Sequence, residues 1–159
     1  MSNFKKNVLF LIIFLLISSC VFSTNFDEKN NYNFKKIYFE VVEKKINFTN
    51  ALPNDLKKMI ESWFSNSVKV NGYNGILEVF INEYNEELVD IPDGKKILLS
   101  LNFEIIIKNE TLSQKETLQV NISEFSEIEG DFSINELEVL KYNTQLNMVS
   151  KMSNLKDKF

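Results

Sequence analysis

The sequence contains no histidine and no arginine, and Cys20 is its only cysteine. Without histidine, the commonest general base of enzymes is missing, and a zinc site built from Cys and His is excluded. A single cysteine also excludes an internal disulfide bond. Only four glycines occur, and none belongs to a phosphate-binding glycine loop. The sequence therefore predicts a protein that is not an enzyme and that needs no cofactor.

The charge balance argues against nucleic acid as a partner. The formal net charge is −4 at pH 7, and it becomes −6 when Lys5 and Lys6 are removed. A nucleic-acid-binding domain normally carries a basic patch. An acidic domain of this size therefore favours another class of partner.

The first twenty residues have the pattern of a secretory signal. A short polar segment with Lys5 and Lys6 precedes an unbroken apolar run, Val8–Ile17, and two small residues, Ser18 and Ser19, follow it. A charged start, an apolar run of this length and a small-residue end are typical of a signal peptide. We predict a signal peptide over residues 1–19.

The residues around Cys20 resemble the bacterial lipobox. In Leu16-Ile17-Ser18-Ser19-Cys20 an aliphatic residue and small residues precede a cysteine. In lipoproteins the chain is cut before this cysteine, and its thiol and new amine are acylated, so the resemblance implies that Cys20 carries a lipid anchor such as palmitate. Two or more acyl chains hold a protein stably on a membrane.

Three alternatives to lipidation remain open at this stage. Cleavage could instead follow Ser23 and release a free secreted protein beginning at Thr24. The segment could stay uncut as an anchor, although the apolar run is shorter than the roughly 20 residues that span a bilayer. Cys20 could also have no role.

We predict a flexible tether over residues 20–34. Residues 21–33 are rich in Ser, Thr, Asn, Asp and Glu and show little periodicity. Such a segment spans about 20 Å on average, which lifts a domain clear of a membrane. Val21 occupies the position where enterobacterial lipoproteins of the inner membrane carry Asp, so the resemblance implies an outer-membrane lipoprotein facing the periplasm.

Residues 35–159 are predicted to form a single α+β domain. Period-2 alternation indicates strands over 36–43, 75–89, 97–108 and 117–123, with a turn at 90–94. Pro53 begins a helix with apolar residues at helical spacing, and Val68 and Val70 form a short extended exit from it. The final helix begins at a capping box, Ser133 to Glu136. Its predicted apolar stripe is Val139, Tyr142, Leu146, Val149 and Met152.

The predicted order is β-α-β-β-β-α. A strand, a crossover helix and a strand favour a parallel pair, and the later strands form antiparallel hairpins. The predicted architecture has two layers, with both helices on one face of a mixed four-stranded sheet. The opposite face is then polar and open.

That open face supplies the candidate site. Its polar side chains come from the third and fourth predicted strands, and they are either a partner-binding face or ordinary solvent-exposed residues: Ser100, Asn102, Glu104, Gln119, Asn121 and Ser123.

Two other features have a functional and a structural interpretation. Trp63 is either a ligand-stacking ring or, as we expect, a core residue of the first helix. The acidic residues of segment 124–131 are expected to form a solvated loop before the last helix; a calcium loop is the alternative, although EF-hand spacing is absent. No metal site is predicted.

The architecture resembles that of the lipopolysaccharide-assembly lipoproteins of the outer membrane. The similarity rests on a lipidated cysteine, a tether and the β-α-β-β-β-α order. It implies a non-catalytic assembly or scaffold subunit that binds a large outer-membrane barrel protein. No ligand-binding residue is transferred by the resemblance. The alternatives are a module for a small apolar ligand held between helices and sheet and a hydrolase using two carboxylates.

Overall fold

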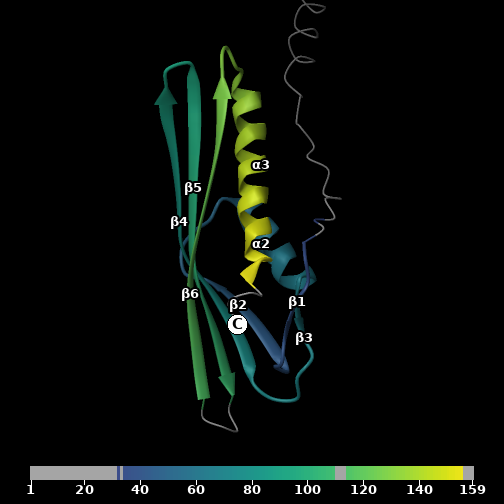
Figure 1. Cartoon of the computed structure of the whole chain (residues 1–159). Helices are drawn as coiled ribbons and strands as arrows, with labels where there is room; N and C mark the ends of the chain where they lie inside the picture. The colour runs from purple at the N-terminus through teal and green to yellow at the C-terminus, as the bar shows by residue number, and fades with distance from the viewer. Residues whose placement is uncertain (1–31, 33, 110–113, 156–159) are drawn as a thin grey trace, which may run out of the picture. The chain divides into compact units, whose positions relative to one another are not determined.

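A computed structural model describes residues 32, 34–109 and 114–155 of the chain. The predicted signal peptide, Cys20 and most of the predicted tether lie outside these residues. The first half of the described chain contains β1 (Ile37–Phe39), β2 (Glu43–Phe48), α2 (Asn54–Asn66) and β3 (Val68–Val70). The second half contains β4 (Ile76–Ile91), β5 (Gly94–Asn109), β6 (Gln114–Glu129) and α3 (Ile134–Met152), as Figure 1 shows.

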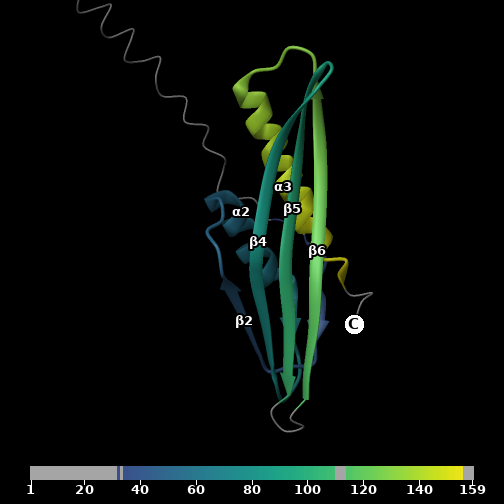
Figure 2. The same cartoon turned by 90° about the vertical axis from the view of Figure 1, so that its left-hand side faces the viewer.

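The predicted α+β class and the mixed four-stranded sheet are confirmed. The strand order is β2-β4-β5-β6, and β2 is parallel to β4 while the other neighbours are antiparallel. Helix α2 therefore lies in the crossover between two parallel strands, as the sequence predicts. Figure 2 views the sheet from the side that neither helix covers; both helices lie behind it.

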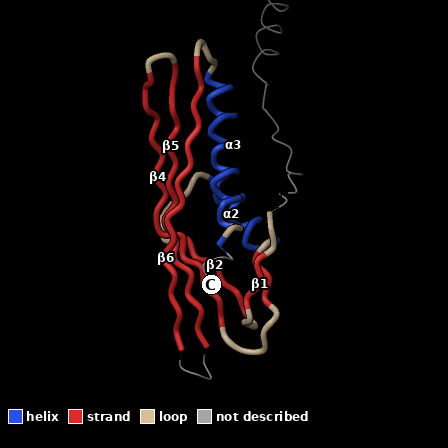
Figure 3. Tube along the Cα trace, in the orientation of Figure 1, coloured by secondary structure: helices blue, strands red, loops and turns tan. Residues whose placement is uncertain are grey.

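The prediction of one strand over 36–43 is wrong. Strand β1 ends at Phe39 and pairs in parallel with β3, which gives a separate two-stranded sheet (Figure 3). The chain then bends, and β2 begins only at Glu43. The sequence does not indicate β2, because Lys44 lies on the same face of this strand as the partly buried apolar residues Ile46 and Phe48. A lysine on that face breaks the apolar alternation by which a strand is recognised.

Strand β5 confirms its predicted apolar face. Leu99, Leu101, Phe103 and Ile105 are buried and face the helices. Strand β6 is longer than predicted and continues to Glu129, so the acidic residues expected in a loop belong mainly to a strand. They are accommodated because two of them form ion pairs, Glu124 with Lys151 and Glu127 with Lys96. Among the described residues no group of acidic, Cys or His side chains could hold a metal ion.

Helix α2 buries the predicted stripe, which includes Trp63 as a core residue. Helix α3 confirms its capping box and the burial of Val149 and Met152, but Val139 is exposed. The helix turns Thr144, Gln145 and Met148 inward instead. This orientation is possible because the buried polar groups are satisfied: Thr144 Oγ1 donates to Leu140 O at 2.7 Å, and Gln145 Nε2 donates to Tyr84 Oη at 3.3 Å.

The first described residue already contacts the domain. The hydroxyls of Tyr32 and Tyr142 share a hydrogen bond of 2.9 Å, and the Tyr32 ring stacks on Phe34. Within the described part of the chain, no helix has the length and apolar character needed to cross a membrane.

Candidate functional site

The register of β5 and β6 brings the six predicted partner residues together. They form three directly opposed pairs: Ser100 with Ser123, Asn102 with Asn121, and Glu104 with Gln119. Because side chains alternate along a strand, all six project from the face opposite the buried residues of β5. We call this surface of β4, β5 and β6 the outer face.

Strand β4 adds residues to the outer face that the sequence alternation does not indicate. The register shifts between Ile81 and Glu83. Such a bulge changes which residues face outward. Before it, Leu77, Val79 and Ile81 are buried; beyond it, Asn85 pairs with Ser100 and Glu87 pairs with Leu98. The only sequence signal is a change of phase, from apolar odd positions to the apolar even positions Tyr84 and Leu88.

Hydrogen bonds between side chains organise the middle of the outer face. The Glu83 carboxylate accepts from Asn85 Nδ2 at 3.2 Å and from Asn102 Nδ2 at 3.3 Å. These contacts orient both amides and leave the oxygen of Asn85 as an acceptor toward its other neighbours.

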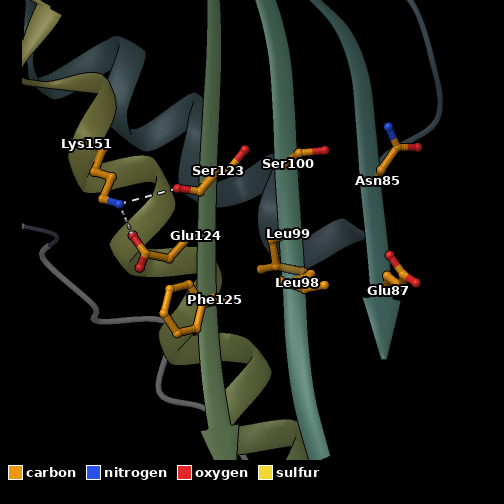
Figure 4. Close-up of a pocket in the computed structure, with 9 residues that line it drawn as sticks. All are labelled: Asn85, Glu87, Leu98, Leu99, Ser100, Ser123, Glu124, Phe125 and Lys151. Carbon is orange, nitrogen blue, oxygen red and sulfur yellow. Dashed lines mark hydrogen bonds and ion pairs between the residues drawn. The ribbon is translucent and has the colours of Figure 1, made fainter. Parts of the chain in front are cut away.

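A hollow of about 310 Å³ crosses the outer face beside these residues. We call it the serine hollow, because the short side chains of Ser100 and Ser123 leave a depression between longer neighbours. Figure 4 shows the nine lining residues, with the two serines and Asn85 in one row across the strands and the next row beside it. The lining consists of Asn85, Glu87, Leu98, Leu99, Ser100, Ser123, Glu124, Phe125 and Lys151.

Of the three charged side chains around the serine hollow, two form an ion pair with each other and one does not. Lys151 Nζ lies 2.6 Å from Glu124 Oε2 and donates to Ser123 O at 3.3 Å (Figure 4). The Glu87 carboxylate, by contrast, has no ion pair or hydrogen-bond partner within residues 34–109 and 114–155. The hollow therefore carries one uncompensated carboxylate.

An aromatic ring forms one wall of the serine hollow. Phe125 is 55% exposed, which is high for a large apolar residue on a sheet, and it lies directly opposite Leu98. On the side of the row away from the serines, Lys96 Nζ lies 4.1 Å from the ring centroid and 2.8 Å from Glu127. The ring thus already contacts one cation.

The outer face contains no tyrosine with a strongly shifted pKa among the described residues. The one tyrosine with a strongly shifted pKa, Tyr84, lies on the opposite side of the sheet, where burial chiefly raises that pKa. Its hydroxyl donates to Glu86 at 2.8 Å and stays protonated at neutral pH. The outer face presents hydroxyls, amides, carboxylates and one ring at fixed spacing, which suits recognition of another molecule.

A second, smaller hollow lies between α3 and the hairpin of β4 and β5. Its volume is about 210 Å³, and its apolar walls are Leu88, Ile97, Ile134 and Leu137. Its rim carries Glu86, Glu138 and Lys141, of which Lys141 and Glu86 form an ion pair of 2.6 Å. We call it the helix hollow.

Solved structures with a similar path of the chain include bacterial lipoproteins. A minor lipoprotein from Acinetobacter baumannii is 14% identical, with a TM-score of 0.49, over 72% of this chain and 91% of its own. Rare lipoprotein B from Shewanella oneidensis is 10% identical, with a TM-score of 0.48, over 74% of this chain and 95% of its own. No protein-family model and no curated protein sequence matches the chain. Similarity at this level carries no conclusion about function.

Proposed function

We propose that the protein is a membrane-anchored, non-catalytic subunit of the bacterial cell envelope. Its outer face binds a larger envelope protein, and Cys20 carries the lipid anchor. The observation that carries the proposal is the outer face itself: three sixteen-residue strands have a mostly polar face that neither helix covers, while both helices cover the other face. A sheet face ordinarily packs against another layer or remains wetted by solvent.

The finer form of this proposal is a role in lipopolysaccharide assembly at the outer membrane. It is supported by the lipobox, the tether and the β-α-β-β-β-α order of the sequence. In this form the partner is a large outer-membrane barrel protein, and the domain faces the periplasm. The acidic domain contributes protein contacts to this role rather than a basic lipid-binding surface.

Photo-crosslinking from the full chain in its native envelope tests the proposal. A benzoylphenylalanine at Asn121 reports on the outer face, and the same group at Glu61, a half-exposed residue of α2, is the matched control. We expect an adduct with one larger envelope protein from position 121 only. Equal labelling from both positions, or a strictly monomeric protein after gentle extraction from the membrane, would reject an outer-face partner.

The helix hollow supports a second candidate function, the binding of a small apolar ligand. Its walls are aliphatic, and Leu88 and Ile134 on its border are exposed. Concave apolar sites with a few polar groups are typical of ligand pockets. Organic extraction of the purified full chain followed by mass spectrometry should then recover a stoichiometric apolar compound, and Leu137→Trp, which fills the hollow, should abolish its recovery.

A further inference from the structure

We propose that the serine hollow binds an arginine side chain of the partner protein, and that Glu87 is the carboxylate that receives its guanidinium. This inference rests on the proposed function, because it names the chemistry of the partner at the outer face. It follows from the charge of the face, the acceptors around the hollow and the exposed ring in its wall.

The charge of the outer face calls for a cationic partner. Of its lysines, Lys96 and Lys108 lie near the two ends of β5 and each pairs with a carboxylate, Glu127 and Glu78 respectively. Lys115 lies opposite Lys108, at the end of the strands away from the serine hollow. In the part of the chain that the structure describes, three carboxylates between these ends have no ion pair: Glu83, Glu87 and Glu104. Complementary charge guides both the encounter and the orientation of two protein surfaces.

The acceptors around the serine hollow suit a group with several donors. The Glu87 carboxylate stands on one side, and the hydroxyls of Ser100 and Ser123 lie in the neighbouring row (Figure 4). Within the described ranges neither serine hydroxyl is hydrogen-bonded to another residue. A guanidinium has five N–H donors in one plane, whereas a lysine ammonium is a compact point charge.

The apolar wall suits the rest of the same side chain. Phe125 and Leu98 lie directly opposite each other and border the hollow. Arginine packs its methylene stem along apolar surface and stacks its guanidinium on aromatic faces. Lys96 occupies the row on the far side of Phe125, and its pairing with Glu127 limits its repulsion of a second cation. A single arginine thus uses both the polar and the apolar parts of the hollow.

The hollow lies where the residues that contribute most of the binding energy of an interface are usually found. Binding energy concentrates in a few anchors, among which arginine and aromatic residues are enriched, near the middle of the contact. The serine hollow crosses the three long strands and includes two of the six residues predicted from sequence, Ser100 and Ser123. The remaining residues of the outer face would surround it and exclude water.

The test places benzoylphenylalanine at Asn85, on the rim of the hollow, in the full chain in its native envelope. We expect the partner peptide attached there to contain an arginine next to the crosslink. Glu87→Gln should reduce the yield of this adduct about fivefold or more, as loss of a charged hydrogen-bond partner implies. Glu104→Gln, on the same face but outside the hollow, is the matched control and should change the yield less than about twofold.

The outcomes separate the inference from the proposed function. An adduct from position 121 combined with a position-85 peptide that lacks arginine, or with equal yields from Glu87→Gln and Glu104→Gln, would overturn the inference and leave the proposed function intact. No adduct from either position 85 or position 121 would reject both. Circular dichroism of each variant shows whether a lost adduct reflects lost folding.

Discussion

At the scale of single residues, Lys44 shows how one charged side chain joins two elements. It extends from β2 to the end of α2, where its Nζ donates to Phe64 O at 2.7 Å and to Val68 O at 2.6 Å. The carbonyls at a helix C-terminus lack intrahelical partners and carry partial negative charge, so a cation there is favourable. Burial chiefly, with a contribution from Lys69, lowers the Lys44 pKa, and this desolvation offsets part of the gain.

We predict that Lys44→Met lowers the free energy of unfolding by about 1–2 kcal/mol, because it leaves these carbonyls without a charged donor. Its sequence neighbour Lys45 is the control, since Lys45 forms only an exposed ion pair with Glu43. Lys45→Met should change stability by less than about 0.5 kcal/mol. Urea denaturation followed by circular dichroism measures both, and equal losses in the two variants would contradict the assigned role of Lys44.

At the scale of elements, the first turn of α3 is stabilised reciprocally. Ser133 Oγ accepts from Glu136 N at 3.2 Å, and the Glu136 carboxylate accepts from Ser133 N at 2.7 Å. The backbone N–H of Ser133, and secondly its hydroxyl, lower the Glu136 pKa. The capping box was predictable from four residues because both contacts are local.

Ser133→Ala should lower the free energy of unfolding by about 1 kcal/mol, the usual effect of removing an N-cap. The pH dependence has a definite sign, because the folded-state pKa of Glu136 is depressed. Its stabilisation is complete above the ordinary carboxyl pKa of 4.5 and is lost as the pH falls through the lower folded value. Glu136→Gln should therefore flatten the acid limb of the stability curve, and Glu138→Gln, two residues further along the helix and outside the cap contacts, is the matched control.

Elements whose signal lies within one stretch of sequence were predicted, and elements that depend on distant contacts were not. Strand β5 and helix α2 each carry a regular apolar face. Strand β2 was missed because Lys44 is satisfied by carbonyls about twenty residues away. The orientation of α3 was not predicted because the polar residues Thr144 and Gln145 are buried against partly buried partners on β6 and β4. Hydrophobic periodicity assigns such polar residues to the exposed face.

The residues of the candidate site also divide into those that a local pattern predicts and those that depend on distant contacts. Its six predicted residues follow from alternation on two strands, and pairing then places them opposite one another. Asn85 and Glu87 face outward only because of the bulge in β4, which the sequence marks by nothing more than the change of phase in its apolar positions. Phe125 and Lys151 were not predicted because the predicted strand ends at Ser123. The sequence does not indicate the ion pair between Glu124 and Lys151, which lies beyond that end.

At the scale of the whole molecule, the proposed function gives the two faces of the sheet different roles. One face, covered by α2 and α3, holds the buried core that stabilises the domain. The other face is free of that constraint, so its residues can serve recognition with little effect on folding. Substitutions such as Glu87→Gln should therefore change binding without changing stability, which makes the crosslinking experiments interpretable.

In the proposed function, a subunit that works by contact has to be held near its partner, and the lipid anchor proposed at Cys20 would hold it there. An anchor raises the effective concentration of the domain at the membrane without any new contact. We predict that fatty-acid label enters the wild-type chain and is absent from Cys20→Ala, while Ser18→Ala, which keeps a small residue in the lipobox, still takes up label. Wild-type label should accompany the outer-membrane fraction. An unlabelled, soluble wild-type protein beginning near Thr24 would instead establish a free secreted module, and an envelope partner would then have to be bound by the outer face alone.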